Sequence, residues 1–379
     1  MIEPGAATRA FGDEVILLGP EGSRPFDAES LEAELRVMWK SATAERGESG
    51  GAVYRAALAN LVVPVDPKRN AQLTPVLVDV TRRHPSRLFL IEVGALDAAR
   101  GLRARITAVC HRREGGGGLV CSEQIVLQGD DAAGSLVPSA VRALLVGDLP
   151  MVLLDLQVSP GLPWMKELIQ MADLVLEDTW MRERPEEEAA IWGLLDTEGT
   201  ARVHDLAWAR LTPWREILAE TFDAAEAAPS LHALREVEIE YGGASPPSPA
   251  WLLAGWLAAR LEWDAVGAAV DALFLRSRSG PVRVRFRGHG ERNGRALERV
   301  RLRADSAQPL DLEVTHRGHE PTATVVLRTP EAARRAVAFG YREFAACIVG
   351  EVHRHEPNPS LESAARLAQQ LLSLWRKAR

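Results

Sequence analysis

The chain has 379 residues, 46% hydrophobic and 26% charged, which is enough apolar material for more than one buried core. Its 52 acidic and 45 basic side chains give a net charge of −7, which disfavours nucleic acid and anionic membranes as partners unless a local basic patch binds them. The N-terminus shows neither a targeting pattern nor a membrane span, and Cys110, Cys121 and Cys347 suggest neither a disulfide framework nor a zinc site. We expect a two-domain cytoplasmic protein in a reducing compartment.

Residues 1–29 are rich in glycine, proline and charge and predict a flexible N-terminal arm with at most one short strand. Residues 30–184 predict an N-terminal α/β domain with a mixed sheet. Its first half reads strand, helix, strand with short links, which indicates a parallel βαβ unit. An antiparallel hairpin follows, and then alternating helices and strands. The segments are a helix from Leu31, strands over 58–65 and 87–93 around a helix over 71–83, hairpin strands over 103–111 and 119–128, helices over 136–145 and 164–171, and strands over 149–156 and 174–177.

Residues 185–230 predict connecting helices, preceded by an exposed charged segment at 182–188. Residues 231–379 predict a C-terminal α+β domain with a largely antiparallel sheet, because apolar and polar residues alternate strictly over 282–327. The other segments are a strand over 235–241 and helices over 250–263, 330–350 and 360–376. The predicted fold class is therefore α/β followed by α+β.

Three glycine-rich motifs invite a catalytic or nucleotide-binding interpretation, and local context disfavours each. Gly47-Glu-Ser49-Gly-Gly51 matches G-x-S-x-G but follows a helix instead of a strand. Gly115–Gly118 is not followed by a helix, and Gly288–Gly294 has the wrong spacing for a dinucleotide fingerprint. We interpret all three as loops or hairpin tips and expect no cofactor.

Histidines and acidic residues offer no complete site in the sequence either. His316 with His319, and His353 with His355, supply two metal ligands at a time where three or four are needed, so no metal site is predicted. Asp155 and Asp178 lie at strand ends, where α/β enzymes bind ligands, but no nucleophile or base accompanies them. We therefore expect no catalytic residues.

Arginine is the more informative residue type. Ten arginines against Glu291 and Glu298 give residues 276–303 a local charge of +8. Strand alternation places two triplets of arginines each on one face, and six guanidinium groups would share one side of the sheet if the faces match. The triplets are Arg283, Arg285 and Arg287, and Arg299, Arg301 and Arg303. Either an anionic partner binds there, or Asp311 and Glu313 on the next strand neutralise part of the array.

Eight of the ten tryptophans lie between Trp164 and Trp263, and tryptophan and arginine are enriched at interface hot spots. Within this stretch, Thr212 and Pro213 predict a helix start, and Trp214 begins an apolar stripe. The candidate partner-binding residues of this segment are Trp208, Arg210, Trp214 and Arg215, in addition to the six arginines. The alternative is that this helix clamps the two domains together.

The string Asp205-Leu-Ala-Trp208-Ala-Arg210-Leu-Thr-Pro213-Trp214-Arg215-Glu216 resembles the glucose-6-phosphate dehydrogenase assembly protein family, OpcA. Other short motifs of the family occur in the same order, and together they cover roughly residues 60–263. They are Asn60-Leu-Val-Val63, His84-Pro-Ser-Arg87, Cys121-Ser-Glu-Gln-Ile125, Asp148-Leu-Pro150, Ala172-Asp173 with Glu177-Asp178-Thr179, and Leu252-Leu-Ala-Gly-Trp256 with Trp263. The chain departs from the family at Met151–Asp155, where tryptophans are frequent, and at Leu174, which replaces a common arginine.

The resemblance implies a non-catalytic assembly factor or allosteric activator that binds glucose-6-phosphate dehydrogenase of the oxidative pentose phosphate pathway, without a cofactor of its own. The alternative is a sugar-phosphate-binding α/β enzyme or sensor, suggested by the acidic strand ends of the first domain. A nucleic-acid binder that uses the arginine strands is disfavoured by the overall acidity and by the scarcity of stacking aromatics there.

Overall fold

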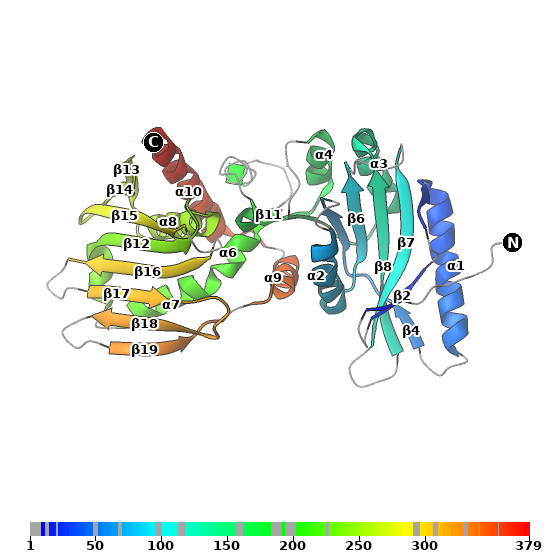
Figure 1. Cartoon of the computed structure of the whole chain (residues 1–379), viewed down its shortest axis with the longest axis horizontal. Coiled ribbons are helices and arrows are strands. Elements are labelled where there is room, and N and C mark those ends of the chain that lie inside the picture. The colour runs from blue at the N-terminus through cyan, green and yellow to red at the C-terminus, as the bar shows by residue number, and fades with distance from the viewer. Residues whose placement is uncertain are drawn as a thin grey trace. The chain divides into compact units, whose positions relative to one another are not determined.

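The computed structural model describes residues 9–11, 15–19, 22–47, 52–66, 70–94, 101–112, 118–156, 162–182, 192–193, 202–224, 227–290, 296–305, 310–328, 333–340, 342–354 and 356–379. Structural statements below concern these residues. The chain divides into two compact units, each built on its own sheet (Figure 1). The first unit comprises Met1–Asp178, Glu198–Val203 and Phe344–His355, and the second comprises Thr179–Thr197, His204–Glu343 and Glu356–Arg379.

The first unit contains an 11-stranded mixed sheet whose main path runs β1-β2-β7-β8-β6-β5-β9-β10-β11. Its strands are β1 (Arg9–Phe11), β2 (Val15–Leu18), β3 (Arg24–Pro25), β4 (Ala52–Arg55), β5 (Asn60–Pro64), β6 (Arg87–Val93), β7 (Arg103–Arg112), β8 (Gly118–Gly129), β9 (Met151–Asp155), β10 (Leu174–Glu177) and β11 (Arg202–Asp205). Its helices are α1 (Ala28–Gly47), α2 (Asn70–Arg83), η1 (Asp131–Leu136), α3 (Val137–Leu144), α4 (Pro163–Met171) and α9 (Phe344–Val352). The predicted arm thus contributes three short strands to the sheet.

The predicted βαβ unit is present as β5, α2 and β6. The two strands pair in parallel, and all five residues of β5 are buried because the centre of a parallel sheet is covered on both faces. The β7 and β8 strands form the predicted antiparallel hairpin, so the sheet is mixed as expected.

The hairpin register also joins two cysteines. Cys110 on β7 lies directly opposite Cys121 on β8, and the two form a disulfide with their Cα atoms 4.0 Å apart. The expectation that the cysteines form no disulfide was therefore wrong. They are 11 positions apart in the sequence, and the antiparallel pairing brings them together.

Two short motifs of the first unit, those that contain Arg87 and Glu123, meet in one polar cluster. Arg87 Nε lies 2.7 Å from Glu123 Oε2, and each side chain is 3% exposed. Trp39 Nε1 donates to Glu123 Oε1 at 2.6 Å, and Arg55 Nε lies 2.8 Å from the same oxygen. Glu32, which is 35% exposed, is a second partner of Arg87 at 2.7 Å. The cluster ties α1, β4, β6 and β8 together.

The second unit contains an eight-stranded sheet in the order β13-β14-β15-β12-β16-β17-β18-β19, in which only the β12–β15 pair is parallel. Its strands are β12 (Leu234–Gly242), β13 (Asp264–Ala268), β14 (Ala272–Ser277), β15 (Gly280–His289), β16 (Leu297–Ala304), β17 (Leu310–Thr315), β18 (Thr322–Arg328) and β19 (Ala333–Ala338). Its helices are η2 (Thr179–Met181), α6 (Leu206–Arg210), α7 (Thr212–Asp223), η3 (Ala228–Ala233), α8 (Ser248–Arg260) and α10 (Pro359–Lys377). The α+β class predicted for this part is confirmed.

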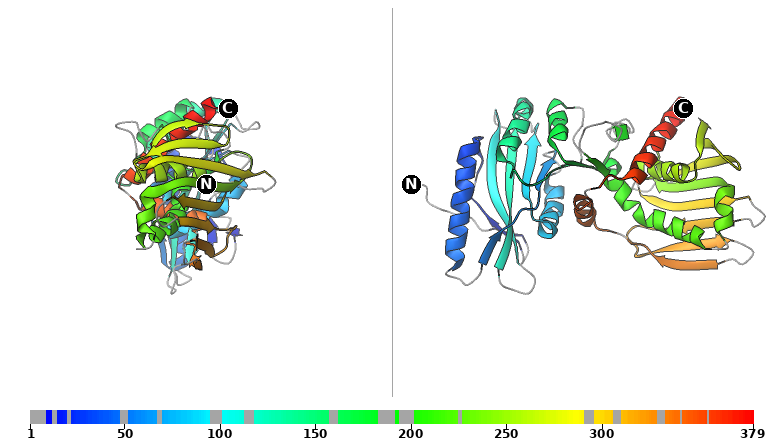
Figure 2. Two further views of the ribbon diagram at one scale, coloured as in Figure 1. Left: turned by 90° about the vertical axis from the view of Figure 1, so that its left-hand side faces the viewer. Right: turned by 180° about the vertical axis from the view of Figure 1, so that it is seen from behind.

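Helices cover one face of this second sheet (Figure 2, right). The core beneath them joins the apolar residues of the strands to α7, α8 and α10, with Trp251, Phe286 and Trp375 in mutual ring contact. Helices α8 and α10 approach closely at Gly255, where an added Cβ would lie 2.2 Å from the carbonyl oxygen of Ala364. Glycine is required at this crossing because any side chain would collide with backbone.

The structure corrects two details of the predicted elements. The helix expected over 330–350 is replaced by the edge strand β19 followed by the short helix α9. Thr212, expected to cap its helix, is already inside α7, which begins without a side-chain cap. The G-x-S-x-G serine, most of the glycine hairpin tip and the charged segment after Arg182 lie outside the described residues. None of the described helices is both long and apolar enough to cross a lipid bilayer.

Candidate partner-binding surface

The six predicted arginines lie on the face of the second sheet opposite the helices. Strand β12 lies between β15 and β16, so the two arginine triplets do not adjoin. The register places Glu236, Glu238 and Glu240 of β12 between them, each level with an arginine on either side. Asp311 and Glu313 of β17 lie level with Arg303 and Arg301 on the far side of β16.

Each carboxylate of β12 bridges neighbouring strands. Glu236 binds Arg285 through one oxygen at 2.5 Å and Arg303 through the other at 2.6 Å. Glu238 lies 2.7 Å from Arg287 and 3.4 Å from Arg299. Glutamates of β12 therefore separate and orient the two arginine triplets.

The outer carboxylates complete the array. Arg301 donates to Asp311 through both Nε, at 2.7 Å, and Nη2. Arg328 on β18 lies 3.6 Å from Asp311 and 3.7 Å from Glu313. The carboxylates of β17 therefore neutralise part of the arginine array, which is one of the two alternatives that the sequence left open. The glutamates of β12 neutralise a further part, which the sequence did not indicate.

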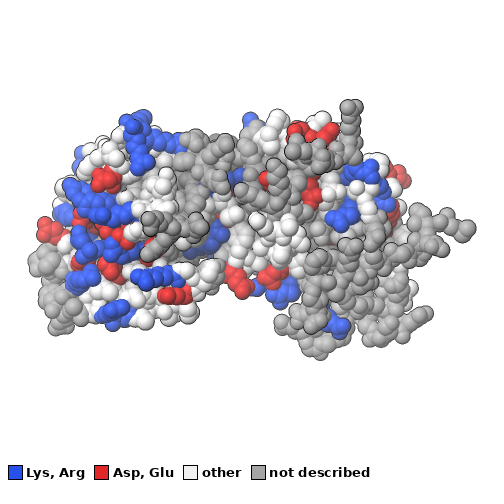
Figure 3. All heavy atoms as spheres, viewed as in Figure 1, with Lys and Arg blue, Asp and Glu red and all other residues white. Residues whose placement is uncertain are grey.

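We call this set the charged face. It has seven arginines and five carboxylates, a net charge of +2, on five strands, with one sign on each strand. Figure 3 shows basic and acidic side chains interleaved on the surface of the second unit. Its members are Arg283, Arg285, Arg287, Arg299, Arg301, Arg303, Arg328, Glu236, Glu238, Glu240, Asp311 and Glu313. Arg283 lies over the ring of Phe274, 5.7 Å from its centroid.

Hydrogen bonds within the charged face shift three pKa values. Hydrogen bonding to Glu238 raises the pKa of Arg287, and hydrogen bonding to Asp311 raises the pKa of Arg301. The hydrogen bond from Arg301 lowers the pKa of Asp311. Arg287, Arg303 and Arg328 nevertheless keep 56%, 42% and 45% of their side chains exposed. The array is ordered internally and still open to a partner.

The other four predicted residues lie on the helical side of the same unit. Trp208 and Trp214 are 2% and 4% exposed and belong to the core. Arg215 lies over the ring of Trp208 at 3.6 Å and donates to Thr212 Oγ1 at 2.9 Å. Arg210 lies over the ring of Trp180 at 4.5 Å. The ten predicted residues therefore form two groups on opposite sides of the sheet.

Asp205 has a structural role at the start of the string that ends at Glu216. Its carboxylate accepts hydrogen bonds from the backbone of Ala207 at 2.8 Å and from the hydroxyl of Thr179 at 2.5 Å. It is 2% exposed and caps α6. The acidic residues at the strand ends of the first unit are buried as well, and Asp155 and Asp178 are both 0% exposed. Their burial gives no support to a substrate site at those carboxylates.

The histidines do not assemble into a metal centre in the part of the chain that the structure describes, where no group of three or more potential ligands occurs. His316 Nε2 donates to the carbonyl oxygen of Glu320 at 2.8 Å. Nε2 of His353 lies 3.2 Å from Nδ1 of His84, the first residue of the motif that ends at Arg87. Gly288 belongs to strand β15, and residues 291–294 of the same glycine-rich motif lie outside the described residues.

Two family models match the chain in succession. Residues 78–191 match the N-terminal domain of the glucose-6-phosphate dehydrogenase subunit family OpcA, and residues 201–365 match the C-terminal domain of the same family. A protein of Nostoc punctiforme named "Putative OxPP cycle protein OpcA" is 30% identical over 224 residues, which are 58% of this chain and 46% of that protein. Its namesake from Synechocystis is 27% identical over 190 residues, 49% of this chain and 39% of that protein. The chain spans less than half the length of these relatives.

The fold is similar to that of an oxidoreductase from Sinorhizobium meliloti, with a TM-score of 0.50 at 12% identity, over 84% of this chain and 97% of that one. Doubly wound enzymes with a parallel sheet hold a dinucleotide at a glycine-rich turn between the first strand and helix of a βαβ unit. Here β5 is followed by Val65-Asp-Pro-Lys-Arg69 before α2, without a glycine. Val65 is 2% exposed and its backbone donates to Ile91. The sequence of this connection therefore lacks the glycines with which such enzymes approach a pyrophosphate.

Proposed function

Because the chain belongs to the OpcA family of glucose-6-phosphate dehydrogenase subunits, we propose that it is a cytoplasmic, non-catalytic factor that binds glucose-6-phosphate dehydrogenase and promotes its assembly or activity. The observation that carries the proposal is the charged face. It is a broad surface on one rigid sheet, with ordered arginines and no role in the core of its own unit.

The geometry of the charged face suits recognition of a protein with exposed carboxylates. Arginine presents a planar fork that binds carboxylate with two hydrogen bonds, and holding the fork in place beforehand reduces the entropy lost on binding. Arg287 and Arg303 are each held by a glutamate of β12 while about half of the side chain stays accessible. Electrostatic complementarity of this kind determines specificity and association rate more than affinity.

Activation requires no catalytic group in this chain. A partner that binds the active conformer or oligomer of an enzyme ten times more tightly than the inactive one shifts that equilibrium tenfold, about 1.4 kcal/mol. The charged face would supply this difference if the matching carboxylates are correctly arranged only in the active oligomer. Dehydrogenase turnover should then rise with the concentration of this protein and saturate.

The experiment compares two double variants for binding to the purified dehydrogenase. Arg287→Gln with Arg303→Gln removes two accessible charges from the charged face, and we expect the Kd to rise about 10- to 100-fold because arginines at interface centres dominate binding energy. Arg276→Gln with Arg278→Gln is the matched control, since these side chains are 69% and 87% exposed and lie outside the charged face.

Titration calorimetry gives the affinity, and the reaction rate of the dehydrogenase gives the functional effect. Equal Kd values for both double variants would exclude the charged face as the binding surface. No complex and no change in rate with the unaltered protein would refute the proposed function itself.

A further inference from the structure

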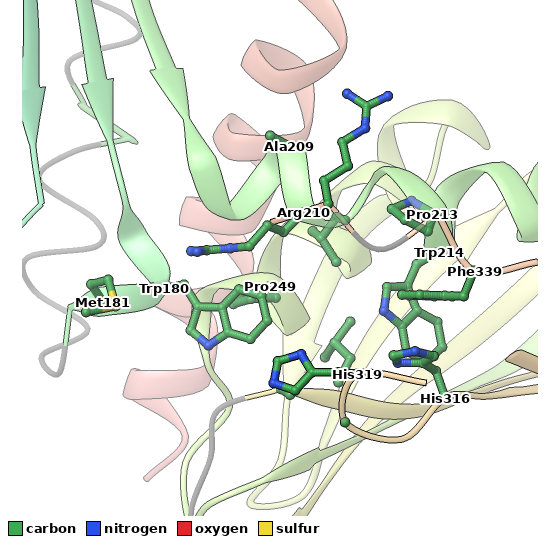
Figure 4. A pocket seen from close by; sticks show the side chains of 16 residues that line it. Trp180, Met181, Ala209, Arg210, Pro213, Trp214, Pro249, His316, His319 and Phe339 are labelled. Carbon is green, nitrogen blue, oxygen red and sulfur yellow. The ribbon is translucent and has the colours of Figure 1, made fainter. Parts of the chain in front are cut away.

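The second unit contains a pocket of about 310 Å³ on its helical side, beside the junction of α6 and α7 (Figure 4). Sixteen residues line it, from η2, the α6–α7 junction, the first turn of α8, the start of β16, the β17–β18 turn and the segment after β19. The volume is at the lower end of the range for small-molecule sites. It therefore suits a ligand with about one ring and is small for a dinucleotide.

Aromatic rings form the inner wall of the pocket. His316 stacks on Phe339 with ring centroids 3.6 Å apart and an angle of 16° between the planes. Trp214 meets the edge of Phe339 at 5.6 Å, and all three residues are at least nine-tenths buried. Figure 4 shows these three rings together on one side of the pocket and Trp180 on the other. Flat walls of this kind accept the face of a ring.

The polar groups around these walls are cationic or neutral and none is acidic. The lining residues include Arg210, Arg342, His316 and His319, and no aspartate or glutamate occurs among the sixteen. Such a surface is unexpected on a chain of net charge −7. Leu211, Pro213 and Trp214, where α6 passes into the 12-residue helix α7, also line the pocket.

Arg210 is held in place before any ligand arrives. Its guanidinium lies over Trp180, 4.5 Å from the ring centroid, and both side chains are half-buried (Figure 4). A guanidinium that stacks on a ring keeps its N–H groups in its own plane, in a fixed orientation beside the ring. Buried aromatic walls and a fixed arginine together favour an anionic group on a cyclic body.

We propose that this pocket binds a small phosphate monoester that carries a single ring, either a sugar or a nucleobase. The phosphate contacts the cationic rim at Arg210 and Arg342, and the ring lies against Trp214 and Phe339. The arginine fork binds phosphate with two parallel N–H···O hydrogen bonds. This inference does not depend on the proposed dehydrogenase partner, and the pocket is on the side of the sheet opposite the charged face.

Gly340 offers a direct way to block the pocket. It lines the cavity, and a Cβ added there would meet nothing within 4 Å, so Gly340→Leu introduces a bulky side chain at the cavity wall with its Cβ in open space. Gly340→Ala is the graded variant. Gly267→Leu is the matched control, because Gly267 also has open space around its Cβ and lies outside the lining residues.

Titration calorimetry of the full chain uses glucose 6-phosphate and adenosine 5′-monophosphate as probes, with glucose and inorganic phosphate as their separate parts. We expect one phosphorylated probe to bind at least tenfold more tightly than either part, which also identifies the ring. Gly340→Leu should reduce that binding at least tenfold, Gly340→Ala less, and Gly267→Leu not at all. Arg342→Gln should weaken the phosphorylated probe and leave any binding of glucose unchanged.

Absence of binding by both phosphorylated probes, or equal binding by Gly340→Leu and Gly267→Leu, would overturn the proposal. Binding of inorganic phosphate as tight as that of the esters would also overturn it, since the aromatic walls would then have no role. A third contradicting result is that Gly340→Leu weakens the dehydrogenase complex while no small probe binds. The pocket would in that case receive a side chain of the partner protein.

Discussion

Replacing Glu123 by glutamine should destabilise the first unit strongly. Glu123 and Arg87 are each 3% exposed and 2.7 Å apart, so the variant leaves the Arg87 charge buried without its main partner. Breaking a buried ion pair costs roughly 3–5 kcal/mol. Glutamine retains an acceptor for Trp39, which donates to Glu123 at 2.6 Å, so we expect about 3 kcal/mol.

The other partner of Arg87 provides the control. Glu32 lies at the same 2.7 Å distance from Arg87 but is 35% exposed. Water can replace its carboxylate, so Glu32→Gln should cost under about 1 kcal/mol. The combined change Arg87→Met with Glu123→Leu should recover part of the loss, because it removes both charges instead of one.

Scanning calorimetry of the full chain measures these differences. A loss of about 3 kcal/mol lowers the midpoint of a unit of this size by roughly 6–12 °C. Equal shifts for Glu123→Gln and Glu32→Gln would refute the reasoning, since they would show that burial of the Arg87–Glu123 pair has no energetic consequence.

Three further predictions concern stability. Gly255→Ala should destabilise the second unit by about 3 kcal/mol, because the new Cβ collides with the backbone of Ala364, and thermal unfolding should show an unchanged transition for the first unit. The hydrogen bond from Arg301 lowers the pKa of Asp311 in the folded protein. Its ionised carboxylate therefore stabilises the fold above the unfolded pKa of about 3.9, and this stabilisation is lost as the pH falls below that value. The free energy of unfolding of Asp311→Asn should depend less on pH below about 4 than that of the unaltered protein. Reducing the β7–β8 disulfide should cost about 3 kcal/mol by the loop-closure relation, measured by urea unfolding with and without reductant; an unchanged midpoint would contradict it.

Local patterns in the sequence predicted most of the elements but not their order in the sheets. Alternation over 282–327 correctly predicted antiparallel strands with arginines on one face. It gave no indication that β12, some forty residues earlier, lies between β15 and β16. Strand order depends on contacts far apart in sequence, which local propensity does not encode. The glutamates of β12 were therefore missed as partners of the arginines.

Two other differences have identifiable causes. Residues 333–338 have the composition of a good helix former, with three alanines and two arginines, yet pairing with β18 makes them an edge strand. The cysteine pair could have been found from the predicted hairpin, because antiparallel pairing around its glycine tip places Cys110 and Cys121 opposite each other. The number and spacing of the three cysteines do not by themselves indicate this disulfide, because the pairing depends on the register of the hairpin.

The candidate site was predictable by residue type and less so by arrangement. The six arginines of the sheet lie on one face as the alternation indicated, whereas Trp208 and Trp214 are buried and serve the core. The pocket beside α7 draws on residues from 180 to 342, and no local pattern indicates that they converge. Convergence of distant segments is a property of the tertiary fold alone.

The arrangement of one charge sign per strand limits how a partner can be placed. Adjacent strands lie about 4.8 Å apart, so a partner displaced sideways by one strand would set its carboxylates against Glu236 and Glu238 instead of arginines. A displacement by two strands would restore attraction at only part of the contact. Repulsion between like charges therefore disfavours any docked position in which the partner is out of register with the strands.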